Sequence, residues 1–175
     1  ASDVYKRQDP FYKQPNKSML HNQDWSEVDL EQLAPDAIPV TAYKPVRDGL
    51  YDQSYTHWDV GGERVSARDY YRIAWRNMAA NTGERTLIPA MIPPGVSHIH
   101  GVNSMALSSG SLEELILAQA KLGSMLADFL IRVVPSGTIA LNKIRRLPFA
   151  FSISGISAAA TLRVLRLNCL TDGYA

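Results

Sequence analysis

Two histidines separated by one residue, His98 and His100, could contribute to a metal site or contact a ligand. If they lie on a β-strand, alternation places both side chains on the same side, as neighbouring metal ligands require. A zinc site needs at least three protein ligands, and no third ligand follows at a matching spacing. We therefore favour hydrogen bonding or ligand contact for the pair and keep a small metal-dependent enzyme as a weaker alternative.

Arginine is the second residue type that could carry function. Residues 61–175 contain twelve Lys/Arg and seven Asp/Glu, a net charge of +5, whereas residues 1–60 contain six and ten, a net charge of −4. The guanidinium group binds phosphates and guanine in a planar, two-pronged way, so a nucleic acid is one candidate partner. A solvated surface with a mild local excess of charge explains the same numbers.

The sequence lacks the motifs of several other kinds of site. It contains no phosphate-binding P-loop, no Gly-rich dinucleotide turn and no paired-cysteine zinc spacing. The single cysteine, Cys169, lies in an apolar helical pattern, so we expect a buried structural thiol. A chain of 175 residues with 46% hydrophobic and 20% charged residues predicts one globular domain.

The strands that would position these residues are predicted from alternation and turn residues. Alternating apolar residues in 71–77 ("YRIAWRN") favour a half-buried strand, although arginines at every fourth position from Arg64 to Arg76 leave a helix open. Turns are expected at Gly61-Gly62 and at Pro93-Pro94-Gly95. Pro89 suggests an edge position for the strand that contains it. Further strands are expected at residues 85–92, 97–107 and 147–153.

The clearest predicted element is one long helix over residues 111–133. Ser111 and Glu114 form a capping box, and apolar residues recur at three and four positions, which predicts a core-facing stripe that ends before Pro135. Shorter helices are expected around residues 25–33, capped by Ser26, and at residues 155–170. Together these elements predict an α/β (α+β) fold, with a small, mostly antiparallel sheet packed on the long helix.

The sequence also predicts where the protein acts. Residues 112–133 are the most apolar stretch, but they include Glu113, Lys121 and Asp128, so we expect no membrane span and no membrane partner. The first residues lack the apolar segment of a signal peptide, and one cysteine fits a reducing compartment. These features predict a cytoplasmic location.

The two ends of the chain differ in pattern from its middle part. Residues 3–8 ("DVYKRQ") resemble the translation of an adapter used to prepare sequencing libraries, so residues 1–8 are left out of the fold prediction. We expect the chain to be a fragment from environmental DNA. Residues 9–62, rich in proline and poor in regular pattern, predict an irregular linker, and residues 154–175 predict a truncated C-terminal helix.

Residues 71–105 contain an Asn-x-x-Glu-Arg-Thr step, an apolar strand and a Pro-Pro-Gly turn. With these motifs the segment resembles the target-recognition region of large adenine-N6 DNA methyltransferases from bacterial restriction and phage-defence systems. These include type IIG enzymes and the BREX and DISARM methylases. Residues 112–150 are similar to the family's long helix, Ser-Gly-Thr turn and Leu-Pro-Phe segment, a pattern shared with type I specificity subunits. The likeness covers about residues 43–170. An Asn-x-x-Glu-Arg-Thr step and a Pro-Pro-Gly turn carry it, formed by Asn81, Glu84, Arg85, Thr86, Pro93, Pro94 and Gly95.

The resemblance implies that this chain is the DNA-reading part of a site-specific adenine methyltransferase. The target-recognition domain would span residues 63–153, and residues 9–62 would link it to a methylase domain that is missing from the chain. That missing domain would bind S-adenosylmethionine and hold the catalytic residues, so no cofactor and no catalytic residue are expected here. Double-stranded DNA and the methylase domain are the implied partners.

Nine residues are candidates for DNA contact. Side chains suited to base edges are Arg72, Arg76, Arg85, His98, His100 and Asn103. Cations in a loop, suited to phosphates, are Lys143, Arg145 and Arg146. We favour a structural role for Arg85, because the Glu-Arg-Thr step recurs in family members that read different targets. The alternative function is a scaffold that docks the recognition region onto the methylase core or a partner subunit, without reading bases.

Overall fold

The computed structural model describes residues 13–16, 18, 20, 21, 24–37, 49–79, 82–107, 111–134, 136–148 and 155–174. The chain divides into two units, one formed by Ala1–Tyr55 with Leu170–Ala175 and the other by Thr56–Cys169. All nine candidate contact residues belong to the second unit. Residues 1–8, Asn81, Pro135 and most of the strand expected at 147–153 lie outside the described residues.

The first unit holds a short antiparallel strand pair. Its elements are β1 (Lys13–Pro15), β2 (Trp25–Glu27), the 3-10 helix η1 (Leu30–Gln32), α1 (Gly49–Ser54) and the 3-10 helix η3 (Asp172–Tyr174). The helix expected around residues 25–33 is limited to η1, and the Ser26 cap is wrong, because Ser26 lies in β2 and donates a hydrogen bond to the Asn16 side chain. Asp29 provides the cap instead, and its carboxylate accepts the Glu31 N–H of η1 at 2.9 Å.

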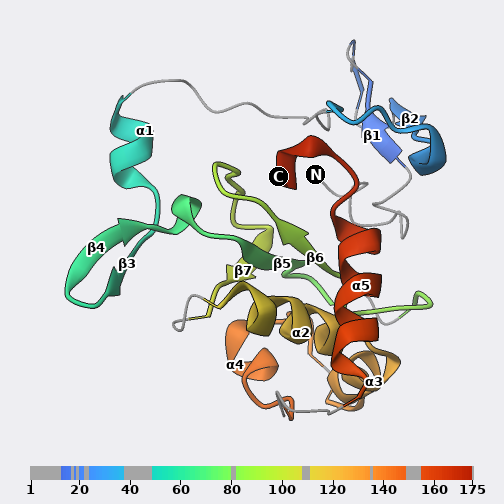
Figure 1. Ribbon diagram of the computed structural model, residues 1–175. Helices are drawn as coiled ribbons and strands as arrows, with labels where there is room; N and C mark the ends of the chain where they lie inside the picture. The colour runs from blue at the N-terminus through green and yellow to red at the C-terminus, as the bar shows by residue number, and fades with distance from the viewer. Residues whose placement is uncertain are drawn as a thin grey trace. The chain divides into compact units, whose positions relative to one another are not determined.

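The second unit begins with a two-stranded hairpin, β3 (His57–Val60) and β4 (Glu63–Ser66), which appears in green in Figure 1. The expected Gly61-Gly62 turn is confirmed, and both glycines have positive φ angles of 63° and 90°, a region that residues with a Cβ rarely adopt. The side chain of Ser66 then caps the 3-10 helix η2 (Ala67–Asp69) by accepting the Arg68 N–H. This short helix leads directly toward the central sheet.

A three-stranded antiparallel sheet occupies the centre of the second unit. Its strands are β5 (Arg72–Arg76), β6 (Pro89–Ile92) and β7 (Val102–Met105), in the order β6-β5-β7. The strand expected at residues 71–77 is therefore confirmed and the helical alternative is wrong. Pro89 lies opposite Trp75 in the edge strand β6, which confirms its expected edge position. Proline has no backbone N–H, so it does not fit a strand that is hydrogen-bonded to neighbours on both sides.

The helices are α2 (Leu112–Leu122), α3 (Met125–Val133), α4 (Leu141–Ile144) and α5 (Ser157–Asn168). Helix α2 packs against β5, β6 and α5, and α5 also bonds to β6 through Asn168, whose side chain accepts the Met91 N–H at 3.0 Å (Figure 1). The Ser111 side chain accepts the Glu114 N–H at 3.3 Å, which confirms the predicted helix start. The fold is thus mixed α/β with small antiparallel sheets, and α5 confirms the helix expected at residues 155–170.

The prediction of one long helix over residues 111–133 is wrong, because the helix is interrupted at Gly123-Ser124. The Gly123 N–H closes α2 by donating to Gln119 O at 2.8 Å. The Ser124 hydroxyl accepts the Ala127 N–H and so starts a new helix, α3. A serine side chain can bond to the backbone N–H groups that follow it, and this bonding competes with continuation of α2 and favours a new helix start.

Only part of the apolar stripe is buried. Leu115 and Leu122 of α2 lie in the core, as does Ile131 of α3. In contrast, Met125 is 85% exposed and Phe129 is 60% exposed on α3. In the parts of the chain that the structure describes, no helix combines the length and apolar character needed to cross a bilayer.

Candidate nucleic-acid interface

Arg85 of the Glu-Arg-Thr step binds the backbone where α2 ends and α3 begins. Its Nη2 atom donates to Gly123 O at 2.8 Å and to Ser124 O at 3.2 Å. Carbonyl groups at a helix C-terminus have no partner within the helix and carry partial negative charge, so a guanidinium stabilises them. The structural role favoured for Arg85 accounts for its position, and we leave Arg85 out of the proposed DNA contacts.

The rest of the step is held by a buried carboxylate. Oδ1 of Asp128, which is 6% exposed, accepts the backbone N–H of Thr86 at 2.7 Å and that of Leu87 at 2.6 Å. Its Oδ2 forms an ion pair of 3.1 Å with Nε of Arg132, and Arg132 Nη2 donates to Gly83 O at 2.6 Å. These bonds join residues 83–87 to one face of α3, so the Glu-Arg-Thr step is part of the packing of the domain.

Two arginines four residues apart in sequence, Arg68 and Arg72, bond to the Pro-Pro-Gly turn and to the residue after it. Arg68 and Gly95 bond through their backbones at 2.8 Å, and Arg68 Nη2 also donates to Gly95 O at 3.2 Å. Arg72 is completely buried, and its guanidinium donates to Val96 O and to Tyr70 O. Because its side chain has no exposed surface in this structure, we leave Arg72 out of the proposed DNA contacts.

The two histidines do not lie on a strand, which corrects the geometry expected for them. They occupy the segment before β7, where Val102 N donates to Ile99 O at 3.0 Å and closes a turn. His98 is half-buried, and its Nε2 lies 2.7 Å from the Ser104 hydroxyl. His100 is exposed in the turn. The two side chains therefore differ in environment, and only His100 is open to a ligand across its surface.

Burial lowers the pKa of His98 below its ordinary value of 6.5. The carbonyl of Ile99 opposes this effect, and the nearby charge of Arg72 adds to it. At neutral pH His98 is consequently a neutral imidazole that bonds to Ser104. Among the described residues, no group of three His, Cys, Asp or Glu side chains is placed to hold a metal ion.

Asn103 is bound inside the domain, in contrast to its expected role as a base contact. Its Nδ2 donates to Asn77 Oδ1 at 3.1 Å and to Ile139 O at 3.0 Å. The same carbonyl of Ile139 accepts Nε1 of the buried Trp75 at 2.8 Å. Both amide hydrogens of Asn103 are thereby used within the fold, so it positions the loop before α4 rather than a base.

The hydrogen bonds of Asn77 gather three separate segments at one end of the sheet. Asn77 N donates to Gly101 O at 3.0 Å, and Asn77 O accepts the Ile139 N–H at 2.6 Å. We call this region the sheet end; it comprises the end of β5, the turn at residues 99–101 and the loop at residues 136–140. Arg76 lies there opposite Val102 of β7, and α4 follows the loop directly.

Cations at and beside the sheet end remain partly or fully open to solvent. Arg76 is half-buried, and its Nε donates to Met78 O at 3.1 Å. Ile144 anchors α4 in the core, whereas Lys143 is half-buried and Arg145 and Arg146 are exposed. The candidates still available for DNA are thus Arg76, His100, Lys143, Arg145 and Arg146.

Sequence reasoning did not assign roles to several residues that position this region. Arg68, Asn77, Asp128 and Arg132 all hold loops in place. Asp128 had a signal in the sequence, because a carboxylate within an apolar helical stripe needs a partner when it is buried. Arg132 stands four residues later, at the spacing that allows such a pair on a helix.

Comparisons with protein-family models, curated proteins and solved structures find nothing that matches this chain.

Proposed function

We propose that this chain is the target-recognition part of an adenine-specific DNA methyltransferase of a bacterial restriction-modification or phage-defence system. The observation that carries the proposal is the sheet end, where Asn77 joins the strand bearing Arg76, the turn bearing His100 and the loop that leads to α4. Arg76 and His100 are thereby carried by segments that meet at one end of the sheet, and Lys143, Arg145 and Arg146 follow the third segment. Such residues combine phosphate and base contact in DNA-binding proteins.

The proposed roles follow the exposure of each side chain. Arg145 and Arg146 are exposed and would neutralise phosphates together with Lys143, which gives affinity without sequence information. Arg76 and His100 would reach base edges, because each offers donors or acceptors that differ between base pairs. The bonds of Asn77 to Gly101 and Ile139 would hold in place the turn that bears His100 and the loop that leads to α4.

The parent enzyme would supply the chemistry from another domain. S-adenosylmethionine and the target adenine would be bound there, and the present chain would select the site, as a target-recognition domain of the type I and type IIG kind does. Such enzymes act on DNA inside the bacterial cell, so the proposal includes a cytoplasmic location.

A docking scaffold is the second candidate function. It is favoured by one observation, that Arg72, Arg85 and Asn103 bind the chain's own carbonyl groups or amides. These are three of the residues whose types suggested base reading. A scaffold would use the remaining cations to bind carboxylates of the methylase core or of a partner subunit.

Selection from a pool of randomised double-stranded DNA tests the main proposal. The 175-residue chain should enrich one short sequence, and His100→Ala should weaken or change the enriched sequence. His21→Ala, which changes an exposed histidine of the first unit, is the matched control and should leave the selection unchanged. Recovery of DNA without any enriched sequence would refute base reading and favour the scaffold.

A further inference from the structure

Helix α3 is apolar on two opposite faces, and only one of them is covered by the described residues. Ala127 and Ile131 are buried, together with Asp128, whose carboxylate holds the Glu-Arg-Thr step. The other side carries Leu126, 63% exposed, and Phe129, 60% exposed. A helix that is hydrophobic all round is normally buried, so the second face of α3 calls for a covering surface.

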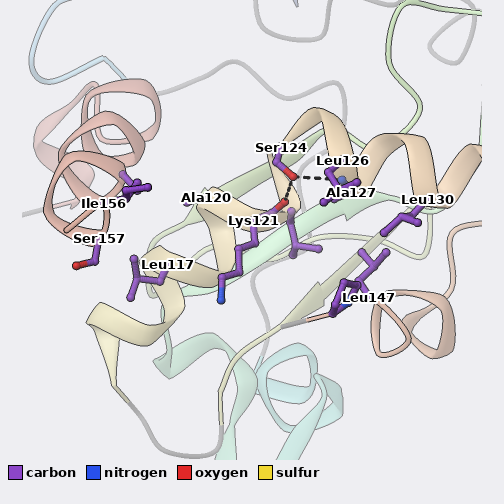
Figure 2. A pocket seen from close by; sticks show the side chains of 13 residues that line it. Leu117, Ala120, Lys121, Ser124, Leu126, Ala127, Leu130, Leu147, Ile156 and Ser157 are labelled. Carbon is purple, nitrogen blue, oxygen red and sulfur yellow. Dashed lines mark hydrogen bonds between the residues drawn. The ribbon is translucent and has the colours of Figure 1, made fainter. Parts of the chain in front are cut away.

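An apolar groove of about 400 Å³ runs beside this face. Figure 2 shows its walls: Leu117 and Ile156 lie on one side, and Leu126, Leu130 and Leu147 lie on the other, with Lys121 between them. The walls therefore come from α2, α3, α5 and the segment after α4, and all belong to the second unit. We call this feature the apolar groove.

The charge around the apolar groove is positive. The exposed Arg145 and Arg146 immediately precede the lining residue Leu147, whereas Nζ of Lys121, the charged residue among those that line the groove, is buried. The first turn of α5, also at the groove, contains no acidic residue, so the positive end of that helix is not neutralised there. Glu113 and Glu114, about one turn before Leu117 on α2, are opposing charges outside the lining.

From the apolar walls and the surrounding positive charge, we propose that the apolar groove and the open face of α3 bind an amphipathic α-helix of a partner protein or domain. One face of that helix is apolar, and acidic residues flank the face. Leucine-sized side chains at positions i, i+3, i+4 and i+7 fill such a groove, and carboxylates pair with the exposed Arg145-Arg146 step. The α3 face is about 13 Å long at 1.5 Å per residue, which matches two to three turns of a helix.

This inference goes beyond the proposed DNA reading and does not depend on it. The partner helix would give a recognition domain a fixed attachment to the rest of a larger enzyme. The Arg145-Arg146 step would then stand between two partners, the acidic helix at the groove and DNA at the sheet end. Binding of the helix is accordingly measured without DNA, so that failure of one proposal does not affect the test of the other.

The test uses two labelled synthetic helices of roughly 18 residues, about five turns. Both carry the same leucine face, flanked by glutamates in one and by lysines in the other. Fluorescence anisotropy with the complete 175-residue chain at about 0.1 M salt should show the acidic helix bound at least about tenfold more tightly than the basic one. Arg145→Gln/Arg146→Gln should reduce that preference.

Leu126→Asp should weaken binding of the acidic helix by about tenfold or more, because it places a carboxylate in the apolar wall. Leu126 is largely exposed, so the variant should keep its fold, which circular dichroism checks. Leu126→Gln provides a milder second variant. Leu167→Asp is the matched control, since Leu167 is 76% exposed on α5 and outside the groove, and it should leave binding unchanged.

Four results would overturn the proposal. They are absence of binding, equal binding of the two helices, insensitivity to both Leu126 variants, and binding to anionic phosphatidylglycerol vesicles that exceeds binding to the acidic helix. Self-association of the chain that Leu126→Asp abolishes, measured by sedimentation equilibrium, would also overturn it, because a second copy would then occupy the groove.

Discussion

Asp128 Oδ1 accepts the backbone N–H of Thr86 at 2.7 Å, across 42 residues of sequence. Because Leu87 donates to the same oxygen, one buried carboxylate satisfies two successive N–H groups of a loop. Buried backbone donors without partners are costly, so a helix residue here determines the conformation of the Glu-Arg-Thr step. That relationship explains why this step belongs to the architecture of the domain rather than to a binding surface.

Replacement of Asp128 by alanine should lower the free energy of unfolding by about 3 kcal/mol, because two buried N–H groups lose a charged acceptor. Asp128→Asn keeps an acceptor oxygen and should lose less, about 1 kcal/mol. Urea denaturation of the two variants measures both values. A change below about 0.5 kcal/mol for the alanine variant would show that the carboxylate does not stabilise the loop.

Two arginines of the same strand should respond in opposite ways to replacement by methionine. Arg72→Met should lower the free energy of unfolding by about 2 kcal/mol, because the carbonyls of Val96 and Tyr70 lose their donor. Arg76→Met, on a half-buried side chain, should change stability by about 0.5 kcal/mol or less and should weaken DNA binding by about 1–3 kcal/mol. Denaturation and DNA titration are measured on each variant. The reverse assignment of the two effects would contradict the structure.

The stability of the second unit should depend on pH through His98. Its pKa is lowered in the folded state, so protonation favours the unfolded state. The contribution is intact above about pH 6.5 and is lost as the pH falls from the unfolded value toward the lower folded value. Denaturation at a series of pH values measures it. His98→Gln, which does not titrate, should flatten this part of the profile, and an unchanged profile would show that another group is responsible.

Much of the fold follows from local patterns that act over a few residues. Alternation around Ile73 and Trp75 correctly predicted β5, and the Ser111 cap correctly predicted the start of α2. Gly61-Gly62 likewise marked a turn because only glycine adopts positive φ there at little cost. These signals are strong because the residues that create them are the residues that form the element.

The missed features depend on contacts between distant residues. The apolar spacing continues without interruption through Gly123, so it could not reveal a break that Arg85 stabilises from 38 residues away. The arginines at every fourth position look alike in sequence, yet Arg72 is buried and Arg64 is exposed. Which of them is exposed is decided by tertiary packing, and the internal bond of Asn103 to Ile139 depends on the same packing.

The dependence of DNA affinity on salt tests the central claim most directly. Each neutralised phosphate contributes about −0.9 to the slope of log K against log salt on B-DNA, so the chain should show a slope of about −3 or steeper. Arg145→Ala/Arg146→Ala should make the slope less negative by about 2. Arg163→Ala/Arg166→Ala is the matched control, because it removes the same charge from exposed positions of α5, and it should change the slope little. A flat slope, or equal effects of the two double variants, would contradict a DNA-binding role for the sheet end.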